Sequence, residues 1–139
     1  MGGCGRPDYL PLRLLLDTHA ALGWATGSGK LSRKACAAIS SPAKEPLLSA
    51  VSAWEIAVKL RKGTLTLPRH VAAEISRLPV CLGFGVLELS WSHAERAASW
   101  DIAHRDPFDR MLAAQSEIDN IPLVTRDPAF REFGTKTFW

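Results

Sequence analysis

Short, almost wholly apolar segments alternate along this chain with longer segments in which apolar residues recur at helical spacing. The apolar segments are residues 12–17, 46–50, 85–90 and 121–125, and residues 136–139 form a possible short last one. A strand without a polar face has to be covered on both sides. The alternation therefore predicts an α/β fold, a three-layer α/β/α arrangement with a mostly parallel central sheet.

The intervening segments carry local helix signals. Ser32 is a candidate N-cap, and Gly63 is a natural C-terminal stop for the helix that starts near Val51. A short extended piece after Gly63 leads into a helix that we expect to end at Pro79. A further helix is expected to begin at Pro107.

Composition limits the class of protein. The chain has 139 residues, 47% of them hydrophobic, and no linker divides it. We therefore expect a single domain over residues 12–139 behind a loose N-terminal leader, residues 1–11. The three cysteines are far apart, which argues against a disulfide framework and favours a reducing cytoplasmic location. No apolar run approaches the ~18 residues that span a bilayer, so no membrane association is expected.

Several acidic residues have local structural explanations. Asp17 and Asp127 follow apolar segments and are placed to cap the helices that come next. Ser52-x-x-Glu55 matches a capping box, and Glu55 also lies one helical turn from Lys59, with which it can pair. Each of these acids taken alone is explained by local structure.

Two acids stand at the start of the helix that begins with Pro107. Asp106, directly before the proline, is the better N-cap. Asp109, in the first helical turn, suits the helix dipole but is not needed as a cap. Its side chain is expected to project near the helix start, where the preceding loop leaves the sheet.

Taken together, the acids point to a metal site. In a parallel sheet the carboxyl ends of all strands share one edge, where ligands bind. Four acids from separate segments are expected to meet there: Asp17, Glu55, Asp109 and Asp127. Like charges this close raise one another's pKa, and a hard divalent cation relieves the repulsion. Oxygen-only ligation favours Mg²⁺, or Mn²⁺, and equips a site to bind phosphate and activate water.

Four stretches carry a family resemblance: "LLLDTHAALGW", "LLSAVSAWEIAVKLRKGTLTLP", "HRDPFDRMLAAQ" and "PLVTRDPAF". With these motifs in this order, the sequence resembles PIN-domain ribonucleases, and more closely the VapC-type toxins of bacterial type II toxin–antitoxin pairs. The resemblance runs from about Leu12 to the C-terminus.

The resemblance implies roles for individual residues. Asp17 and Asp109 match the acids that bind the metal, Glu55 matches the second acid of the family, and Asp127 matches the more variable fourth. Thr125 falls where a Ser or Thr often supports the site. Asp106 is assigned to holding the loop and the helix start rather than to the metal.

The resemblance also implies an activity and partners. It predicts a Mg²⁺-dependent endoribonuclease toxin in which water attacks the scissile phosphorus in line and the metal stabilises the leaving oxygen. A cognate antitoxin and homodimerisation are implied in the same way.

Basic residues near these motifs are candidates for the RNA backbone. Lys59 and Lys62 belong to an acid-free stretch from Ile56 to Ala73, for which a solvated helix face is the competing explanation. Arg110 and Arg126 adjoin candidate site acids and are the stronger candidates for a phosphate contact.

Two histidines and a tryptophan need separate predictions. His104 is an RNA contact, a residue that supports a metal ligand, or a loop residue that satisfies a backbone group. His19 is interpreted as structural. Trp54, at helical spacing with Val51 and Val58, is expected in the core.

Two other functions stay open on the sequence alone. A phosphatase of the haloacid dehalogenase type also uses an Asp at the end of a first strand, but it requires a second Asp where His19 stands. A non-catalytic module that binds RNA or protein is the other alternative, against which the presence of all four acids argues.

Overall fold

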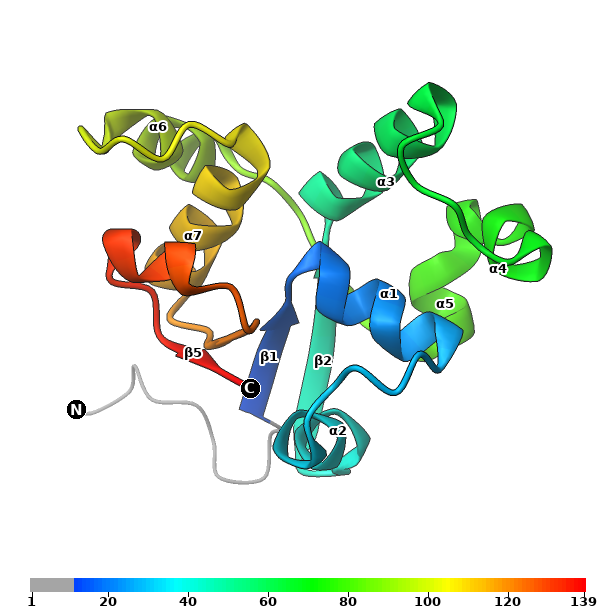
Figure 1. Cartoon of the computed structure of the whole chain (residues 1–139). Coiled ribbons are helices and arrows are strands. Elements are labelled where there is room, and N and C mark those ends of the chain that lie inside the picture. Colours follow the sequence, from blue (N-terminus) through cyan, green and yellow to red (C-terminus); the bar gives the residue numbers. More distant parts are fainter. Residues whose placement is uncertain (1–11) are drawn as a thin grey trace.

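The computed structural model describes residues 12–139 of the chain. The predicted leader, residues 1–11, lies outside the described residues. The central sheet has five strands in the order β3-β2-β1-β4-β5, and every neighbouring pair runs parallel (Figure 1). The strands are β1 (Leu12–Leu16), β2 (Lys44–Ser49), β3 (Gly85–Leu87), β4 (Leu123–Val124) and β5 (Thr137–Phe138). The parallel sheet predicted from the apolar segments is confirmed.

Helices cover both faces of this sheet and complete the three predicted layers (Figure 1). They are α1 (Thr18–Thr26), α2 (Arg33–Ser40), α3 (Ala50–Lys62), α4 (Arg69–Ala73), α5 (Leu78–Leu82), α6 (Trp91–Ser99) and α7 (Pro107–Asp119), with 3₁₀ helices η1 (Ile75–Arg77) and η2 (Pro128–Phe133). None of the helices in residues 12–139 has the length and apolar character needed to cross a bilayer.

The hydrophobic core is divided by the sheet into two halves. Leu14 and Leu16 of β1 face one half, which contains buried residues of α1, α2, α3 and α5. Leu15 faces the other half, with buried residues of α7 and η2. This alternation along one strand is the reason that β1 has no polar face: it is covered on both sides.

Local signals set most helix ends. Ser32 caps α2 by accepting a hydrogen bond from Ala35 N, and α3 ends at Gly63, whose φ of +74° favours glycine. The prediction that Pro79 ends a helix is wrong. Pro79 lies instead in the first turn of α5, where its missing N–H costs no hydrogen bond.

Trp54 is not in the core, contrary to the prediction from helical spacing. Val51 and Ile56 are the buried hydrophobic residues of this part of α3, whereas Trp54 is 58% exposed. Its ring packs against that of Phe108 of α7 in a T-shaped pair, with 5.4 Å between the ring centroids. The apolar face of α3 is rotated toward α1 and the sheet, which leaves Trp54 at the α3–α7 junction.

The strand order fixes where a site can form. The chain winds from β1 through β2 to β3 on one side and places β4 and β5 on the other side of β1. The carboxyl ends of β1 and β4 therefore border the point where the winding direction reverses, which is the usual location of ligand sites in such sheets. Asp17 directly follows β1, and Thr125 directly follows β4.

Candidate active site

Asp17 is held at the end of β1 by two donors. Its Oδ1 accepts a hydrogen bond from Ala20 N at 2.6 Å, which confirms the predicted N-cap of α1. Its Oδ2 accepts a hydrogen bond from the Thr125 hydroxyl, and that hydroxyl accepts one from Asp127 N at 3.1 Å. Burial raises the pKa of Asp17 above its ordinary value, and the nearby charge of Asp127 adds to the rise. The carboxylate is thus fixed in place and electrostatically unfavourable.

Asp109 lies in the first turn of α7, one turn after the N-cap. Asp106 is that cap, as predicted, because its Oδ1 accepts hydrogen bonds from Phe108 N and Asp109 N. The Oδ2 of Asp109 lies 2.9 Å from His104 Nε2. Burial, followed by the charges of Asp106 and Asp127, raises the pKa of Asp109 to about 6, although the His104 hydrogen bond opposes the rise.

Glu55 is buried inside α3 and does not belong to a capping box. The N-cap of α3 is Ser49, so the capping-box prediction for Ser52 is wrong. Glu55 Oε1 accepts a hydrogen bond from Thr18 Oγ1 at 2.6 Å, and Oε2 pairs with Lys59 Nζ at 2.6 Å. The predicted Glu55–Lys59 pair is therefore confirmed.

Asp127 directly precedes η2 and is the most exposed of the four acids. Its Oδ1 accepts a hydrogen bond from Ala129 N at 2.9 Å, so the predicted N-cap before Pro128 is confirmed. Its charge also raises the pKa of both Asp17 and Asp109. Asp127 thus caps a helix and at the same time adds negative charge near Asp17 and Asp109.

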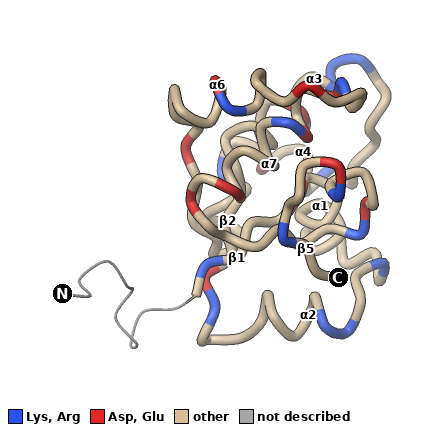
Figure 2. The backbone as a smooth tube through the Cα atoms, turned by 90° about the vertical axis from the view of Figure 1, so that its left-hand side faces the viewer, with Lys and Arg blue, Asp and Glu red and all other residues tan. Residues whose placement is uncertain are grey.

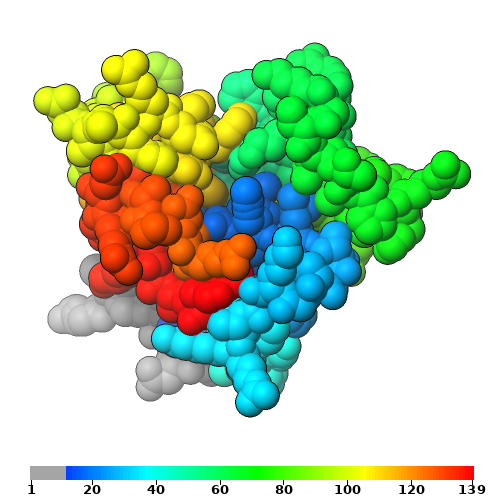
Figure 3. All heavy atoms as spheres, in the orientation of Figure 1, coloured from blue at the N-terminus to red at the C-terminus, as the bar shows by residue number. Residues whose placement is uncertain are grey.

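The four acids share one cavity of about 400 Å³, which is named the acid cavity below. It lies at the carboxyl ends of β1 and β4, and its other lining residues include Asp106, Thr18, His19, Lys59 and Arg126. In the space-filling view the segment after β1, in blue, is recessed between the orange segment after β4 and the yellow and green helices (Figure 3). The predicted meeting of acids from separate segments at one sheet edge is observed.

The acids are not already arranged as a closed set of ligands. Across residues 12–139, no three His, Cys, Asp or Glu side chains are grouped closely enough to hold a metal ion. Asp17 is turned to Thr125, Asp109 to His104, and Glu55 to Thr18 and Lys59. A set of three ligands for one cation therefore requires side-chain rotation of the acids within the cavity.

The chemistry of the lining nonetheless fits a hard divalent cation. The acids offer carboxylate oxygens, which Mg²⁺ and Mn²⁺ prefer. Two of them, Asp17 and Asp109, have raised pKa values because they are buried near other acids. A bound cation reverses that effect by favouring the charged carboxylates.

The raised pKa of Asp109 leads to a stability prediction for the protein in EDTA. The folded protein disfavours the ionised carboxylate, so Asp109→Asn is expected to raise the free energy of unfolding at pH 7.5 by about 1–2 kcal/mol, or the Tm by roughly 4 °C. The pKa of Asp109 is higher in the folded state, so the wild type gains stability as pH falls from about 6 toward 3.8, the ordinary pKa of an aspartate. The difference in free energy of unfolding between Asp109→Asn and the wild type is expected to be largest above pH 6 and absent below pH 3.8.

Thermal unfolding between pH 4 and pH 8 measures this difference. Asp101→Asn is the matched control, because Asp101 is exposed on the loop before α7 and outside the acid cavity. An Asp109→Asn protein that is less stable than wild type at pH 7.5 would contradict the prediction.

Of the basic candidates, the structure corrects the prediction for Arg110. Its guanidinium donates hydrogen bonds to four backbone carbonyls, those of His104 (2.7 Å), Ala97 (2.9 Å), Trp100 (3.0 Å) and Ile102 (3.0 Å). These bonds use four of the five N–H donors of the guanidinium. Arg110 therefore holds the loop between α6 and α7 rather than facing the cavity.

The remaining candidates fall into two groups. Lys59 and Arg126 line the acid cavity, although Lys59 is also paired with Glu55. Lys62 is exposed at the end of α3 and does not line it. Figure 2 shows basic segments, in blue, at this end of α3 and on α2. Lys62 stays a prediction of a more distant RNA contact.

Three site residues were missed or misjudged from the sequence. Thr18 and Ser52 are buried and hydrogen-bonded to each other at 2.9 Å, which links α1 to α3 behind Glu55. His19, interpreted as structural, is exposed and lines the acid cavity. The sequence positions of Thr18 and His19 could have indicated that they belong to the site. Both directly follow Asp17, at the start of a helix that leaves the same sheet edge.

Comparison with known proteins identifies the family. The model of the PIN domain family matches residues 14–136, so this chain belongs to the PIN domain family. The predicted PIN resemblance and fold are confirmed. No curated protein sequence matches the chain.

Solved structures share the fold at low identity. VapBC2 from Rickettsia felis, bound to a DNA fragment from its promoter, has a TM-score of 0.66 and 13% identity, over 91% of this chain and 98% of that chain. FitAcB from Neisseria gonorrhoeae has a TM-score of 0.62 and 17% identity, over 91% and 96%. A toxin–antitoxin complex from Klebsiella pneumoniae has a TM-score of 0.55 and 19% identity, over 82% and 86%.

Proposed function

We propose that this protein is a metal-dependent endoribonuclease of the VapC type, the toxin of a toxin–antitoxin pair that acts in the cytoplasm. The observation that carries the proposal is the lining of the acid cavity: four acids from four separate segments, at the point where the strand order reverses. PIN domains are generally nucleases, and membership of that family removes the haloacid dehalogenase alternative.

The acids have distinct tasks in this proposal. Asp17 and Asp109 would hold Mg²⁺ or Mn²⁺, with Glu55 and Asp127 orienting the attacking water or assisting with a second ion. When bound, the metal supplies a Lewis acid for the phosphodiester and lowers the pKa of water. Thr125 and His104 keep the carboxylates of Asp17 and Asp109 oriented through their hydrogen bonds. Lys59 and Arg126, at the same cavity, attract the anionic RNA backbone.

The proposed partners follow from the structural neighbours. One of them is described as a toxin–antitoxin complex, which supports a cognate antitoxin for this chain. We also propose that the protein forms a homodimer, as implied by the sequence resemblance.

Cleavage of purified RNA tests the proposed function. The protein is expected to cut single-stranded RNA with Mg²⁺ or Mn²⁺ present and to lose this activity in EDTA. Because water, not the 2′-hydroxyl, is the proposed nucleophile, a 2′-deoxy substitution at the cut site is expected to leave cleavage intact. The products should carry a 5′-phosphate and a 3′-hydroxyl.

Two outcomes would argue against the proposal. Tight RNA binding without cleavage in either metal would favour a non-catalytic PIN module. Products that end in a 2′,3′-cyclic phosphate would assign the attack to the RNA itself and remove the role proposed for the acids.

A further inference from the structure

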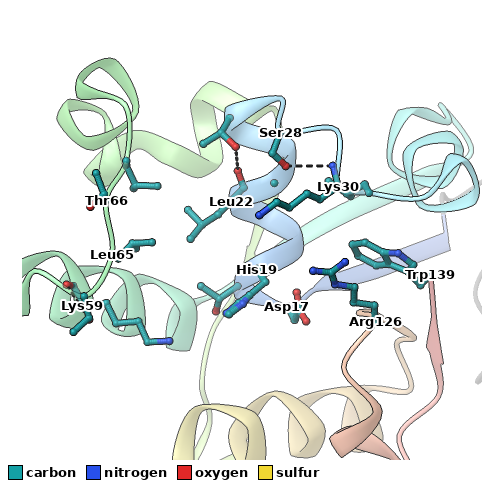
Figure 4. A pocket seen from close by; sticks show the side chains of 16 residues that line it. Asp17, His19, Leu22, Ser28, Lys30, Lys59, Leu65, Thr66, Arg126 and Trp139 are labelled. Carbon is teal, nitrogen blue, oxygen red and sulfur yellow. Dashed lines mark hydrogen bonds between the residues drawn. The ribbon is translucent and has the colours of Figure 1, made fainter.

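A second and larger cavity, of about 530 Å³, adjoins the acid cavity (Figure 4). It is named the flanking cavity below. The two cavities share Asp17, Thr18, His19, Lys59 and Arg126 along their common border. A polymer bound with one phosphate at the acids would therefore extend directly into the flanking cavity.

The charged lining of the flanking cavity is nearly all basic. Lys30 follows α1, Lys59 belongs to α3 and Arg126 follows β4, and all three side chains line the cavity together with His19 of α1. Figure 4 shows these four side chains around one open space, with Asp17 at its edge. Among residues 12–139, Asp17 is the only acid that lines this cavity. Cations brought together from separate segments favour an anionic ligand.

The rest of the lining is apolar or carries hydroxyl groups. Leu22 and Leu31 line one part of the cavity, and Leu65 and Leu67 line another. The Trp139 ring closes the cavity beside Arg126, whose guanidinium carbon lies 5.9 Å from the ring centroid. An aromatic face and aliphatic side chains next to cations fit a nucleobase joined to a phosphate.

We propose that the flanking cavity is a subsite for the nucleotide next to the scissile phosphate in single-stranded RNA. The base would pack on Trp139 and the leucines, and the adjoining phosphate would lie near Lys30 and Arg126. This inference rests on the proposed function. The volume is within the range of roughly 300–1,000 Å³ typical of small-ligand sites, so one splayed nucleotide fits.

The subsite restricts the substrate. A base can enter such a cavity only when it is unpaired and unstacked, which is the usual basis of sequence-specific RNA recognition. RNA loops and single strands are therefore expected as substrates, with duplex RNA excluded. The base preference of the enzyme is expected to be strongest at the one position that occupies the flanking cavity.

Binding of short single-stranded RNA in EDTA tests the subsite without cleavage. The parent protein is Asp109→Asn, because Asp109 lines only the acid cavity. Adding Trp139→Ala is expected to weaken binding about 10-fold, whereas Trp139→Phe should keep most of the affinity. Adding Lys30→Ala is expected to lower the slope of log affinity against log salt by about 0.7.

Two variants match these changes outside the flanking cavity. Trp91 is 85% exposed on α6, so Trp91→Ala removes an equally large ring, and Lys34→Ala removes an equal charge from α2. Both are expected to bind RNA as the parent does. Circular dichroism of every variant establishes that a loss of binding is not a loss of fold.

Cleavage of a randomised RNA pool by the wild type and Trp139→Ala separates this inference from the proposed function. A wild type that binds RNA through Trp139 and Lys30 but never cuts it would end the nuclease proposal and leave the subsite standing. A wild type that cuts RNA, with affinity and base preference unchanged in Trp139→Ala and Lys30→Ala, would overturn the subsite. That second result would instead fit a cavity reserved for a protein segment.

Discussion

Asp17→Asn and Asp109→Asn are each expected to reduce RNA cleavage by about 1,000-fold or more while the protein stays folded. Asparagine keeps the size of aspartate and one acceptor oxygen. At position 17 this oxygen can still accept a hydrogen bond from Ala20 N or from Thr125, and at position 109 it can still pair with His104. What the substitutions remove is the negative charge, on which cation binding depends. The measurement is the cleavage rate of a defined single-stranded RNA at saturating Mg²⁺.

Matched controls make this result specific. Asp101→Asn changes the same kind of side chain outside the acid cavity and is expected to cleave at the wild-type rate. Cleavage by both Asp17→Asn and Asp109→Asn at the wild-type rate would remove the proposed metal site. A loss that excess Mn²⁺ partly restores would strengthen it, since it would point to weakened metal binding rather than to misfolding.

This activity change and the stability change of Asp109→Asn are expected to have opposite signs. The acids proposed to bind the cation are those whose ionised form the fold disfavours, because burial raises the pKa of Asp17 and Asp109. A more stable but inactive variant is the usual result when a site is kept electrostatically unfavourable for its ligand.

The fold and the acids were predictable from the sequence because both depend on local patterns. Strands without a polar face imply a covered parallel sheet, and a parallel sheet brings the ends of β1 and β4 to one edge. Asp17 and Asp127 could thus be placed together from their positions after apolar segments. The N-caps formed by Asp17, Asp106 and Asp127 were likewise correct, because a cap depends on only a few neighbouring residues.

The errors concern contacts between elements. Helical spacing identifies which residues of α3 share a face, but not how the helix is rotated against α1 and α7. Trp54 was therefore wrongly placed in the core, and the bonds of Thr18 to Ser52 and Glu55 were missed. The prediction for Arg110 failed for a related reason: a long side chain beside a site acid can turn toward either the cavity or its own loop.

Arg110→Ala is expected to lower the free energy of unfolding by about 3 kcal/mol, or the Tm by roughly 10 °C. Its guanidinium is the shared donor for four carbonyls between Ala97 and His104, and alanine would leave all four without it. Because this loop carries His104, whose ring orients Asp109, RNA cleavage is expected to fall as well, even below the new Tm.

The lysine variant and a neighbouring arginine decide between this explanation and an RNA contact for Arg110. Arg110→Lys keeps the charge but cannot reach four carbonyls with one ammonium group, so most of the stability loss is expected to remain. Arg105→Ala, on the exposed part of the same loop, should leave the Tm unchanged. If Arg110→Ala kept the wild-type Tm and only weakened RNA binding with a smaller salt dependence, that result would support the RNA phosphate contact predicted from the sequence. Because the guanidinium already donates to four carbonyls, we expect the loss of stability instead.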